Sequence, residues 1–492
     1  MRILLVYPRF PDTFWGFKHA LGFVNRKASS PPLGLATVAA MLPAEWEKRL
    51  VDMNVRPLRQ SDLEWADYVF VSAMDLQRDS VSRVIAQCKQ AGVKVVAGGP
   101  LFTSEPDAYP EVDTLVLNEA ELTLPLFLQD LEQGTPQHLY TTGEFVDMQR
   151  TPIPLFSLLD REAYDSMSIQ FSRGCPYHCD FCDITVLLGH RPRLKSTQQV
   201  IAELDSLYAL GWRGNVFFVD DNFIGNKRAL KAEVLPALIE WRRDKPDYTF
   251  STEVSINLAD DEELMNSMAQ AGFNSLFVGI ETPNAESLQE CHKTQNEGRD
   301  LEESVRRMQR HGFQVMGGFI VGFDSDTPDV FRRQADFIQK TGIVAAMVGL
   351  LQAPTGTPLY ERMRSEGRLR SEMSGNNTDG STNIVPKMPW DTLISGYKSL
   401  VAEIYSPKMI YERIATFLRE YQPPRIRTRI HGREVLALVR SIFVMGVRGP
   451  ERLAYWKLFW GTLLRTPRKF PMAITLSIYG YHFRKVSALQ AG

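Results

Sequence analysis

Short apolar runs alternate with segments of helical periodicity in the first quarter of the chain. The runs at 3–6, 69–72 and 93–97 are rich in β-branched residues, whereas 33–42 and 80–91 repeat apolar residues at helical spacing. Strands that alternate with helices predict a parallel sheet with helices on both faces. Ligands of such a sheet bind at the carboxyl ends of its strands.

A second alternating series follows a stretch rich in Pro, Thr and Gly at 135–156, which is typical of a linker. Helical patterns such as 198–210 and 260–271 separate its apolar runs. Six runs are predicted strands: 168–171, 216–219, 249–254, 275–280, 315–321 and 345–351. Six consecutive βα units favour a partial barrel over a flat sheet.

The chain of 492 residues is too long for one hydrophobic core. We expect an α/β protein with a Rossmann-like domain at 1–134, a linker at 135–160, a partial six-unit (β/α) barrel of the TIM type at 161–367 and an α-helical, basic domain at 368–492. The last domain begins with a polar loop at 371–383, and only helical patterns follow it.

The formal net charge is -2, but positive charge is concentrated at the carboxyl terminus. From Arg425 onward, thirteen Lys or Arg accompany two Glu, a net charge of +11. Arg440, Arg448 and Lys457 keep the apolar segments too short to span a membrane. We favour contact of this tail with a membrane interface over a helical cap with a solvated basic face. No RNA-binding module accompanies the charge, so no nucleic-acid partner is expected.

The amino-terminal apolar run ends at Pro8, before it could serve as a signal peptide or a membrane span. Five cysteines, three of them within eight residues, do not make a disulfide framework in a chain of this length. We therefore expect a cytoplasmic protein, which the basic tail would hold at the inner face of the membrane.

The candidate chemistry lies in the segment SRGCPYHCDFCD, where Cys175, Cys179 and Cys182 have the spacing CxxxCxxC. Three thiolates can hold three irons of a 4Fe–4S cubane and leave the fourth iron open. A structural zinc site usually takes four ligands in paired spacings, and His178 lies inside the loop, where it does not obviously complete one. The sequence therefore predicts an iron–sulfur cluster.

With Phe181 directly before Cys182 and six βα units, the triplet resembles the radical S-adenosylmethionine superfamily. The resemblance implies that the open iron binds the methionine end of S-adenosylmethionine and that reductive cleavage yields a 5'-deoxyadenosyl radical. It places Phe181 near the adenine. Further S-adenosylmethionine ligands are expected at the strand ends, with helix capping as the alternative role: Asp220, Asp221, Asn222, Glu253 and Glu281.

The first block resembles the cobalamin-binding domain of many such enzymes through VYPRF, PPLGLATVAA, VSAM, AGGP and NEAE, in that order. The cobalt-ligating motif DxHxxG is replaced by DMNVRP, with Asn54 at the His position and Pro57 at the Gly position, so a His ligand is not expected. Met74 and Gln77 are candidates for the lower face of the corrin. The full set of candidate cobalamin contacts is Pro8, Asn54, Ser72, Met74, Gln77, Gly98, Gly99 and Glu119.

Over nearly its whole length the chain resembles cobalamin-dependent radical S-adenosylmethionine enzymes, and most closely the hopanoid C-2 methylase group, in stretches such as RGCPYHCDFCDI, FFVDDNFIGN and LLQAPTGTPLYERM. The resemblance implies methyl transfer to an unactivated carbon of a hydrophobic small molecule, a hopanoid or related polycyclic lipid. It also implies an external electron donor such as flavodoxin or ferredoxin.

Other activities remain open at this point. They are cyclisation, rearrangement or dehydrogenation by a cobalamin radical enzyme, methylation of a tetrapyrrole side chain, and a non-enzymatic cobalamin or iron–sulfur sensor. Because the carbon centre demands no general acid or base, none of the eight histidines is assigned a catalytic role.

Overall fold

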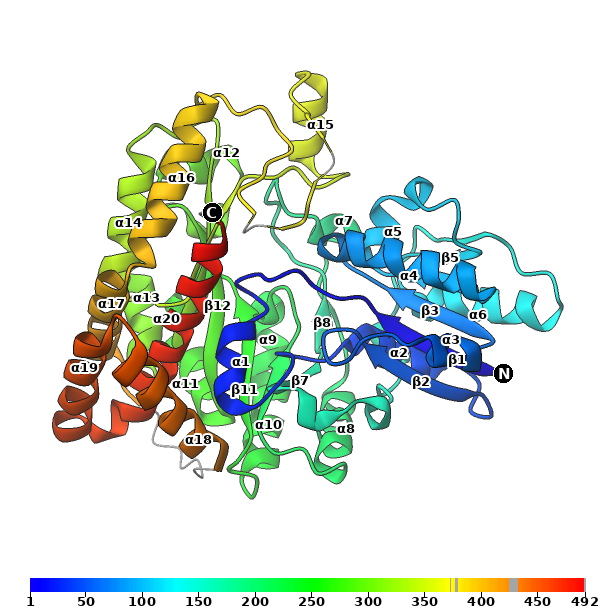
Figure 1. Ribbon diagram of the computed structural model, residues 1–492, viewed down its shortest axis with the longest axis horizontal. Helices are drawn as coiled ribbons and strands as arrows, with labels where there is room; N and C mark the ends of the chain where they lie inside the picture. Colours follow the sequence, from blue (N-terminus) through cyan, green and yellow to red (C-terminus); the bar gives the residue numbers. More distant parts are fainter. Residues whose placement is uncertain (372, 377–378, 424–431, 491–492) are drawn as a thin grey trace.

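Two parallel sheets lie side by side in the molecule, and the carboxyl-terminal helices pack on the far side of the second sheet (Figure 1). The computed structural model describes residues 1–371, 373–376, 379–423 and 432–490. The α/β fold class predicted from the sequence, with two parallel sheets and a helical carboxyl-terminal region, is confirmed.

The first sheet has the strand order β2-β1-β3-β4-β5-β6, and all neighbours are parallel. Its strands are β1 (Arg2–Tyr7), β2 (Glu47–Asp52), β3 (Tyr68–Ser72), β4 (Lys94–Gly98), β5 (Thr114–Val116) and β6 (Leu139–Tyr140). Three strands, β2, β5 and β6, lie outside the predicted runs. β2 has the mixed sequence EKRLVD, and β6 lies within the predicted linker.

Helices cover both faces of this sheet because side chains alternate along each strand. Ile3 and Leu5 of β1 pack in the core beneath α2 (Leu33–Met41) and α6 (Ala120–Glu132), whereas Leu4 and Val6 pack in the core beneath α3 (Gln60–Trp65) and α4 (Arg78–Ala91). A strand buried on both faces has a continuous apolar sequence, which explains why the local pattern predicted it.

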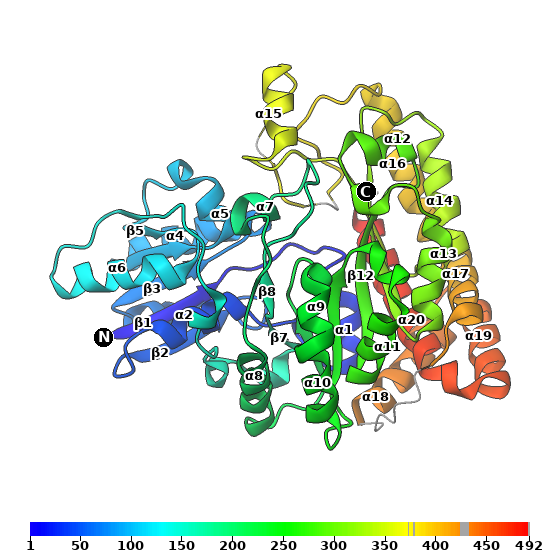
Figure 2. The ribbon, with the colours of Figure 1, turned by 180° about the vertical axis from the view of Figure 1, so that it is seen from behind.

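The second sheet has the order β14-β13-β12-β11-β10-β7, again with parallel neighbours. Its strands are β7 (Ser166–Ile169), β10 (Asn215–Phe218), β11 (Thr249–Val254), β12 (Phe273–Glu281), β13 (Gln314–Val321) and β14 (Ala346–Leu350). The helices on its outer side are α8 (Thr197–Ala209), α10 (Leu235–Arg242), α11 (Glu262–Ala271), α13 (Leu301–Arg310) and α14 (Val330–Thr341) (Figure 2). Its two edge strands, β7 and β14, make it the expected partial barrel.

The two ends of the chain cover the open side of this barrel. Helix α1 (Lys18–Val24) packs against α18 (Gly432–Ser441) and α20 (Phe470–Gln490), beside the barrel strands (Figure 1). Ala28 then forms a parallel bridge with Tyr164, just before β7. Residues 10–31, which the sequence pattern placed in the amino-terminal domain, are therefore part of the barrel wall.

The carboxyl-terminal region is helical, as predicted. It contains α15 (Pro358–Ser365), α16 (Trp390–Ile404), α17 (Pro407–Glu420), α18, η10 (Ile442–Arg448), α19 (Arg452–Arg465) and α20. The fully buried Arg413 joins it to the barrel by donating to the carbonyl oxygens of Ile404 (2.8 Å) and Val344 (3.2 Å). Among the described residues, no helix is long and apolar enough to cross a membrane.

Candidate functional site

The three-cysteine loop is held at its base by a short hairpin. Strands β8 (Ser172–Arg173) and β9 (Arg193–Leu194) pair antiparallel, and the amide of Cys175 donates to the carbonyl of Gly189 at 3.2 Å. Gly174 has φ +94°, and a Cβ there would lie 2.8 Å from the carbonyl oxygen of Gly189. Only glycine therefore fits directly before Cys175.

The cysteine thiols lie among hydrogen-bond donors. The side-chain amide of Asn222 is 4.0 Å from the sulfur of Cys175, and that of Gln295 is 3.6 Å from the sulfur of Cys179. The Lys293 ammonium group lies near Cys179 and Cys182. Amide donors and a cation stabilise thiolates, so these surroundings fit thiolates bound to iron.

The arrangement fits a cluster better than a single ion. In the part of the chain that the structure describes, no three His, Cys, Asp or Glu side chains converge closely enough to hold one metal ion. A cubane needs thiolates that stand apart, each on its own iron. His178, which lies inside the cysteine loop, stacks on His190, and their ring centroids are 4.2 Å apart.

Asp220 accepts hydrogen bonds from the segment that leads into the cysteine loop. It is fully buried, and its carboxylate accepts hydrogen bonds from the amide of Phe171 (3.0 Å) and from the amide and hydroxyl (2.6 Å) of Ser172. Three protein donors thus engage Asp220, and its contact with S-adenosylmethionine stays a prediction. The residue positions the strand that leads into the cysteine loop.

Asp221 and Asn222 also lie behind the cluster loop. Burial raises the pKa of Asp221 to about 7, and its Oδ2 atom has no hydrogen-bond partner among the described residues. Asn222 is buried and accepts a hydrogen bond from the amide of Ser255 at 3.1 Å, while its own amide faces Cys175. The geometry places Asn222 beside the cluster ligand.

Glu253 and Glu281 both line the large cavity described below. Burial, with the nearby carboxylates of Asp221 and Asp220, raises the pKa of Glu253 to about 8. Glu281 ends β12 with φ +64° and pairs with Lys293 at 2.6 Å.

Lys293 has no counterpart in the sequence prediction. It follows α12 (Ala285–Glu290), and its ammonium lies 5.8 Å from the ring centroid of Phe181. The Glu281–Lys293 pair thus stands beside the aromatic residue expected near the adenine. No periodicity or spacing in the sequence signals this loop residue.

In the first domain, two amides shape the loop after β1. Asn54 donates to the carbonyl of Pro8 (3.3 Å) and accepts from the amide of Phe10 (2.9 Å). Gln77 also donates to the Pro8 carbonyl and accepts from the amide of Met74 (2.9 Å). Asn54 and Met74 line the cavity, and Met74 is 49% exposed there.

Ser72 at the end of β3 packs closely against Gly98 and Gly99 at the end of β4. A Cβ on Gly99, which has φ +93°, would lie 2.6 Å from the hydroxyl oxygen of Ser72. A Cβ on Gly98 would lie 2.4 Å from the carbonyl oxygen of Val116. Contacts within the protein therefore require both glycines.

Glu119 joins the two domains through ion pairs, and its predicted contact with cobalamin stays a prediction. It is 5% exposed and accepts from Arg173 (2.8 Å), Arg193 (2.8 Å) and the amide of Val146 (2.8 Å). Glu121 binds Arg173 as well, at 2.8 Å. Two guanidinium groups from the cluster hairpin thus bind the carboxylate, and they fix the first sheet opposite the cysteine loop.

A continuous cavity of about 2570 Å³ joins the first domain, the cluster loop and the barrel. The first domain contributes Asn54 and Met74, the cluster loop contributes Phe181 and Cys182, and the barrel contributes Glu253 and further residues. Single ligands usually occupy about 300–1,000 Å³. The cavity has room for several ligands at once.

A Rossmann-like sheet that faces a three-cysteine loop in a partial barrel defines a class: radical enzymes that combine cobalamin with S-adenosylmethionine. Comparison with known families supports each part of this description. The B12 binding domain matches residues 21–128, the Radical SAM superfamily matches 169–338, and a domain of unknown function (DUF4070) matches 357–491.

Proteins that are similar over nearly the whole chain point to the same class. The chain is 41% identical to an uncharacterized methyltransferase of Synechocystis sp. (98% of this chain, 91% of the relative) and 36% identical to the hopanoid C-2 methylase of Rhodopseudomonas palustris (94% and 90%). The radical S-adenosylmethionine methyltransferase TsrM from Kitasatospora setae, solved with cobalamin and a 4Fe–4S cluster, shares the fold with TM-score 0.59 at 15% identity (97% and 99%).

The chain belongs to the cobalamin-dependent radical S-adenosylmethionine enzymes. It is a methyltransferase of that family, and its cofactors are a 4Fe–4S cluster, S-adenosylmethionine and cobalamin. Such an enzyme requires an electron donor and a small-molecule substrate.

Proposed function

We propose that this enzyme transfers a methyl group to an unactivated carbon of a polycyclic lipid, a hopanoid or a related compound. The observation that carries the proposal is the apolar section of the cavity, which continues from the cluster loop into the barrel. Identity of 36% to a hopanoid C-2 methylase supports the same substrate class.

The apolar section is walled by aromatic and thioether side chains. Trp15 belongs to the segment that covers the open side of the barrel. The centroid of its ring lies 4.6 Å from the ring centroid of Phe277 on β12. Met316 and Met347 line the same section. A Cβ on Gly318 would lie 2.8 Å from the Phe277 ring, so glycine leaves room for that ring. Such walls suit a rigid apolar ring system and exclude water from it.

When bound, the cofactors supply a hydrogen-abstracting radical and the methyl group. The protein's own groups position them. Cys175, Cys179 and Cys182 would hold the cluster, and Phe181 with the Glu281–Lys293 pair lies next to it. Glu253 offers an acceptor toward the cavity for a ribose hydroxyl or an ammonium group.

A membrane-facing surface on the carboxyl-terminal helices fits a lipid substrate. Val435, Val439, Phe443 and Val447 recur every four residues along α18 and η10 and are 49–58% exposed. The guanidinium group of Arg448 lies 4.3 Å from the Phe443 ring centroid. Val435 also lines the cavity, so this surface borders it.

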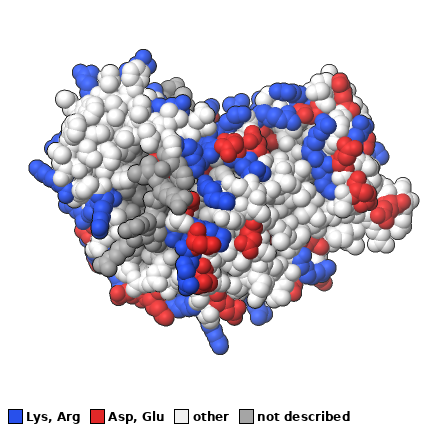
Figure 3. Space-filling model, turned by 90° about the horizontal axis from the view of Figure 1, so that it is seen from below, with Lys and Arg blue, Asp and Glu red and all other residues white. Residues whose placement is uncertain are grey.

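The view from below shows a broad surface without charged side chains on the side of the molecule that carries these helices, with Lys and Arg at its edge (Figure 3). Helix α19 adds three exposed apolar residues, with exposed fractions of 81% for Leu453, 51% for Trp460 and 75% for Leu464. Apolar residues with a basic rim are typical of peripheral binding to anionic lipids. We propose this surface as the membrane contact.

The test is anaerobic reconstitution with iron, sulfide and cobalamin, followed by addition of S-adenosylmethionine, reduced flavodoxin or ferredoxin, and a pentacyclic triterpene. We expect 5'-deoxyadenosine, S-adenosylhomocysteine and a lipid heavier by one methylene, detected by mass spectrometry. A lipid changed without mass gain would point to cyclisation or dehydrogenation. Methylation of a tetrapyrrole but not of the triterpene would refute the lipid assignment.

A further inference from the structure

The cavity continues beyond the apolar section to the amino-terminal ends of the barrel strands. There Ser251 of β11 pairs in register with Ser275 of β12, and Ser275 pairs with Gln314 of β13. All three line the cavity. A row of polar side chains therefore crosses the barrel at the end opposite the cluster.

The wall changes from polar to apolar along two neighbouring strands. The inward-facing residues, from the far end toward the cluster, are Ser275, Phe277 and Gly279 on β12, and Gln314, Met316, Gly318 and Ile320 on β13. At about 3.3 Å per residue, the path from Gln314 to Ile320 is roughly 20 Å long. Gln314 is thus well separated from the carboxyl ends of β12 and β13, where the cofactors are expected to bind, whereas Ser251 lies two residues before Glu253 on β11.

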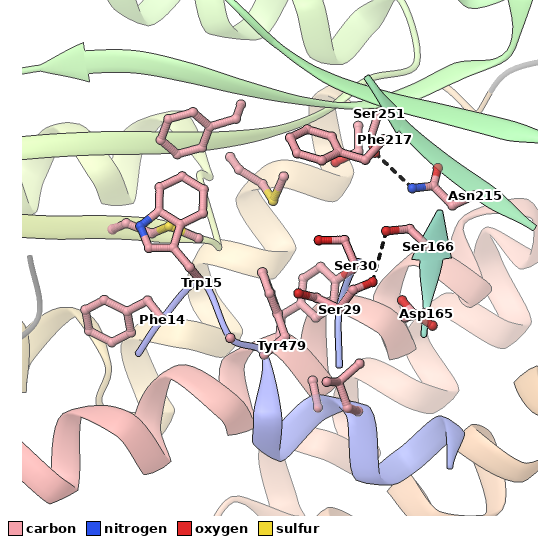
Figure 4. A pocket seen from close by; sticks show the side chains of 18 of the residues that line it. Phe14, Trp15, Ser29, Ser30, Asp165, Ser166, Asn215, Phe217, Ser251 and Tyr479 are labelled. Atoms are coloured by element: carbon pink, nitrogen blue, oxygen red, sulfur yellow. Dashed lines mark hydrogen bonds between the residues drawn. The ribbon is translucent and has the colours of Figure 1, made fainter. Parts of the chain in front are cut away.

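Further polar groups face this end of the cavity. Figure 4 shows Ser29, Ser30, Asp165 and Ser166 across from Trp15. The Ser166 hydroxyl donates to the carbonyl of Ser29 at 3.0 Å, which fixes the covering segment against β7.

On the neighbouring strands, Asn215 donates to the hydroxyl of Ser251 at 2.9 Å (Figure 4). The hydroxyls of Ser166 and Ser251 each keep lone pairs that these two bonds do not use.

Part of this hydrogen-bonding capacity is unused within the protein. Gln314 is 5% exposed, and its Nε2 atom has no hydrogen-bond partner in the described part of the chain. A buried amide donor without an acceptor is costly, and a ligand oxygen would satisfy it. Asp165 is exposed, and its carboxyl group faces the same space. These groups suit hydroxyls, which both donate and accept.

We propose that this polar end, formed by Ser251, Ser275, Gln314 and Asp165, binds the hydroxyl groups of a chain attached to the apolar ring system of the substrate. The inference rests on the proposed function. It sets the orientation of the lipid, because the hydroxylated chain lies at the far end and the ring farthest from that chain lies next to the cluster. Methylation is then expected on that ring.

The experiment measures binding to the reconstituted holoenzyme without turnover. The probes are a pentacyclic triterpene hydrocarbon and the same ring system with a tetrahydroxylated side chain, delivered from cyclodextrin and quantified by mass spectrometry after gel filtration. We expect the hydroxylated probe to bind about three- to tenfold more tightly, as one or more added hydrogen bonds would give. Gln314→Leu should weaken binding of that probe alone.

Ser251→Ala provides a second, milder variant should Gln314→Leu fail to fold. Asp336→Asn on the exposed surface of α14 is the matched control and should bind both probes like the wild type. Equal affinity of the wild type for the two probes would overturn the inference and leave the proposed function standing. Binding of neither probe would overturn both.

Discussion

The imidazole of His482 donates from Nε2 to the carbonyl oxygen of Phe14 at 3.0 Å, and its Nδ1 accepts from the backbone amide of His19 at 3.4 Å. A neutral ring with its proton on Nε2 satisfies both contacts. Phe14 also packs on Phe483, with centroids 5.2 Å apart. These contacts tie the two ends of the chain together across the open side of the barrel.

The stability of this closure should depend on pH. Burial lowers the pKa of His482 to about 4, from about 6.5 in an unfolded chain. Because the unfolded chain takes up the proton first as the pH falls, this contribution to the free energy of unfolding is complete above pH 6.5. As the pH falls from 6.5 to 4, the free energy of unfolding decreases by about 3 kcal/mol. Urea unfolding of wild type and His482→Gln across this range checks the prediction, and parallel pH profiles would contradict it.

Strands such as β1 were predictable because both of their faces are buried, which gives a continuous apolar sequence. The closure of the barrel was not predictable. The contacts of His482 with Phe14 and His19 join opposite ends of the chain and leave no local periodicity in the sequence. β2 was missed for a related reason. As an edge strand it carries the charged residues of EKRLVD, which interrupt the apolar run.

The residues of the site also divide into those that a local pattern predicts and those that only the fold brings together. The spacing of Cys175, Cys179 and Cys182 predicted the cluster from a short segment. Lys293 was missed, because only the fold brings it beside that segment. Glu119 was assigned to cobalamin because NEAE resembles a segment of the cobalamin-binding domain, but its arginine partners lie far along the chain. Long-range ion pairs leave no signal in a single sequence.

Glu119→Gln should destabilise the protein whether or not cobalamin is present. The substitution leaves Arg173 and Arg193 with too little negative charge in a buried network, and breaking such pairs costs about 3–5 kcal/mol. Denaturant unfolding of the cofactor-free protein measures the loss. Glu132→Gln, at the exposed end of α6, should unfold like the wild type. Normal stability with selective loss of cobalamin would instead support a ligand role for Glu119.

Cys179→Ala should abolish cluster binding and S-adenosylmethionine cleavage together, because two thiolates do not retain a cubane that three hold. Iron and sulfide analysis with visible absorption measures the cluster, and formation of 5'-deoxyadenosine measures cleavage. Cys88→Ala is the matched control, since Cys88 is buried in the first domain and should leave the cluster intact. A full cluster in Cys179→Ala would refute the assignment.

Glu253→Gln and Asp220→Asn should fail in different ways. Glu253 faces the cavity, so its amide variant should fold normally but raise the KM for S-adenosylmethionine about tenfold, the cost of weakening one hydrogen bond to the ligand. Asp220 accepts only from the protein, so its variant should lower thermal stability and cluster content. The melting temperature and KM of each variant separate the two roles. Equal changes in melting temperature and KM in the two variants would argue against separate roles for Glu253 and Asp220.

Trp15→Ala should uncouple radical formation from methyl transfer. The indole covers the open side of the barrel against Phe277, and its removal leaves the lipid less constrained and more accessible to water. We expect about tenfold more 5'-deoxyadenosine per methylated lipid, while the cluster content stays normal because Trp15 is not one of the cluster ligands. Trp390→Ala, at the exposed start of α16, should keep the wild-type ratio. An unchanged ratio in Trp15→Ala would show that this wall does not hold the substrate, and the substrate path would then have to be sought elsewhere in the cavity.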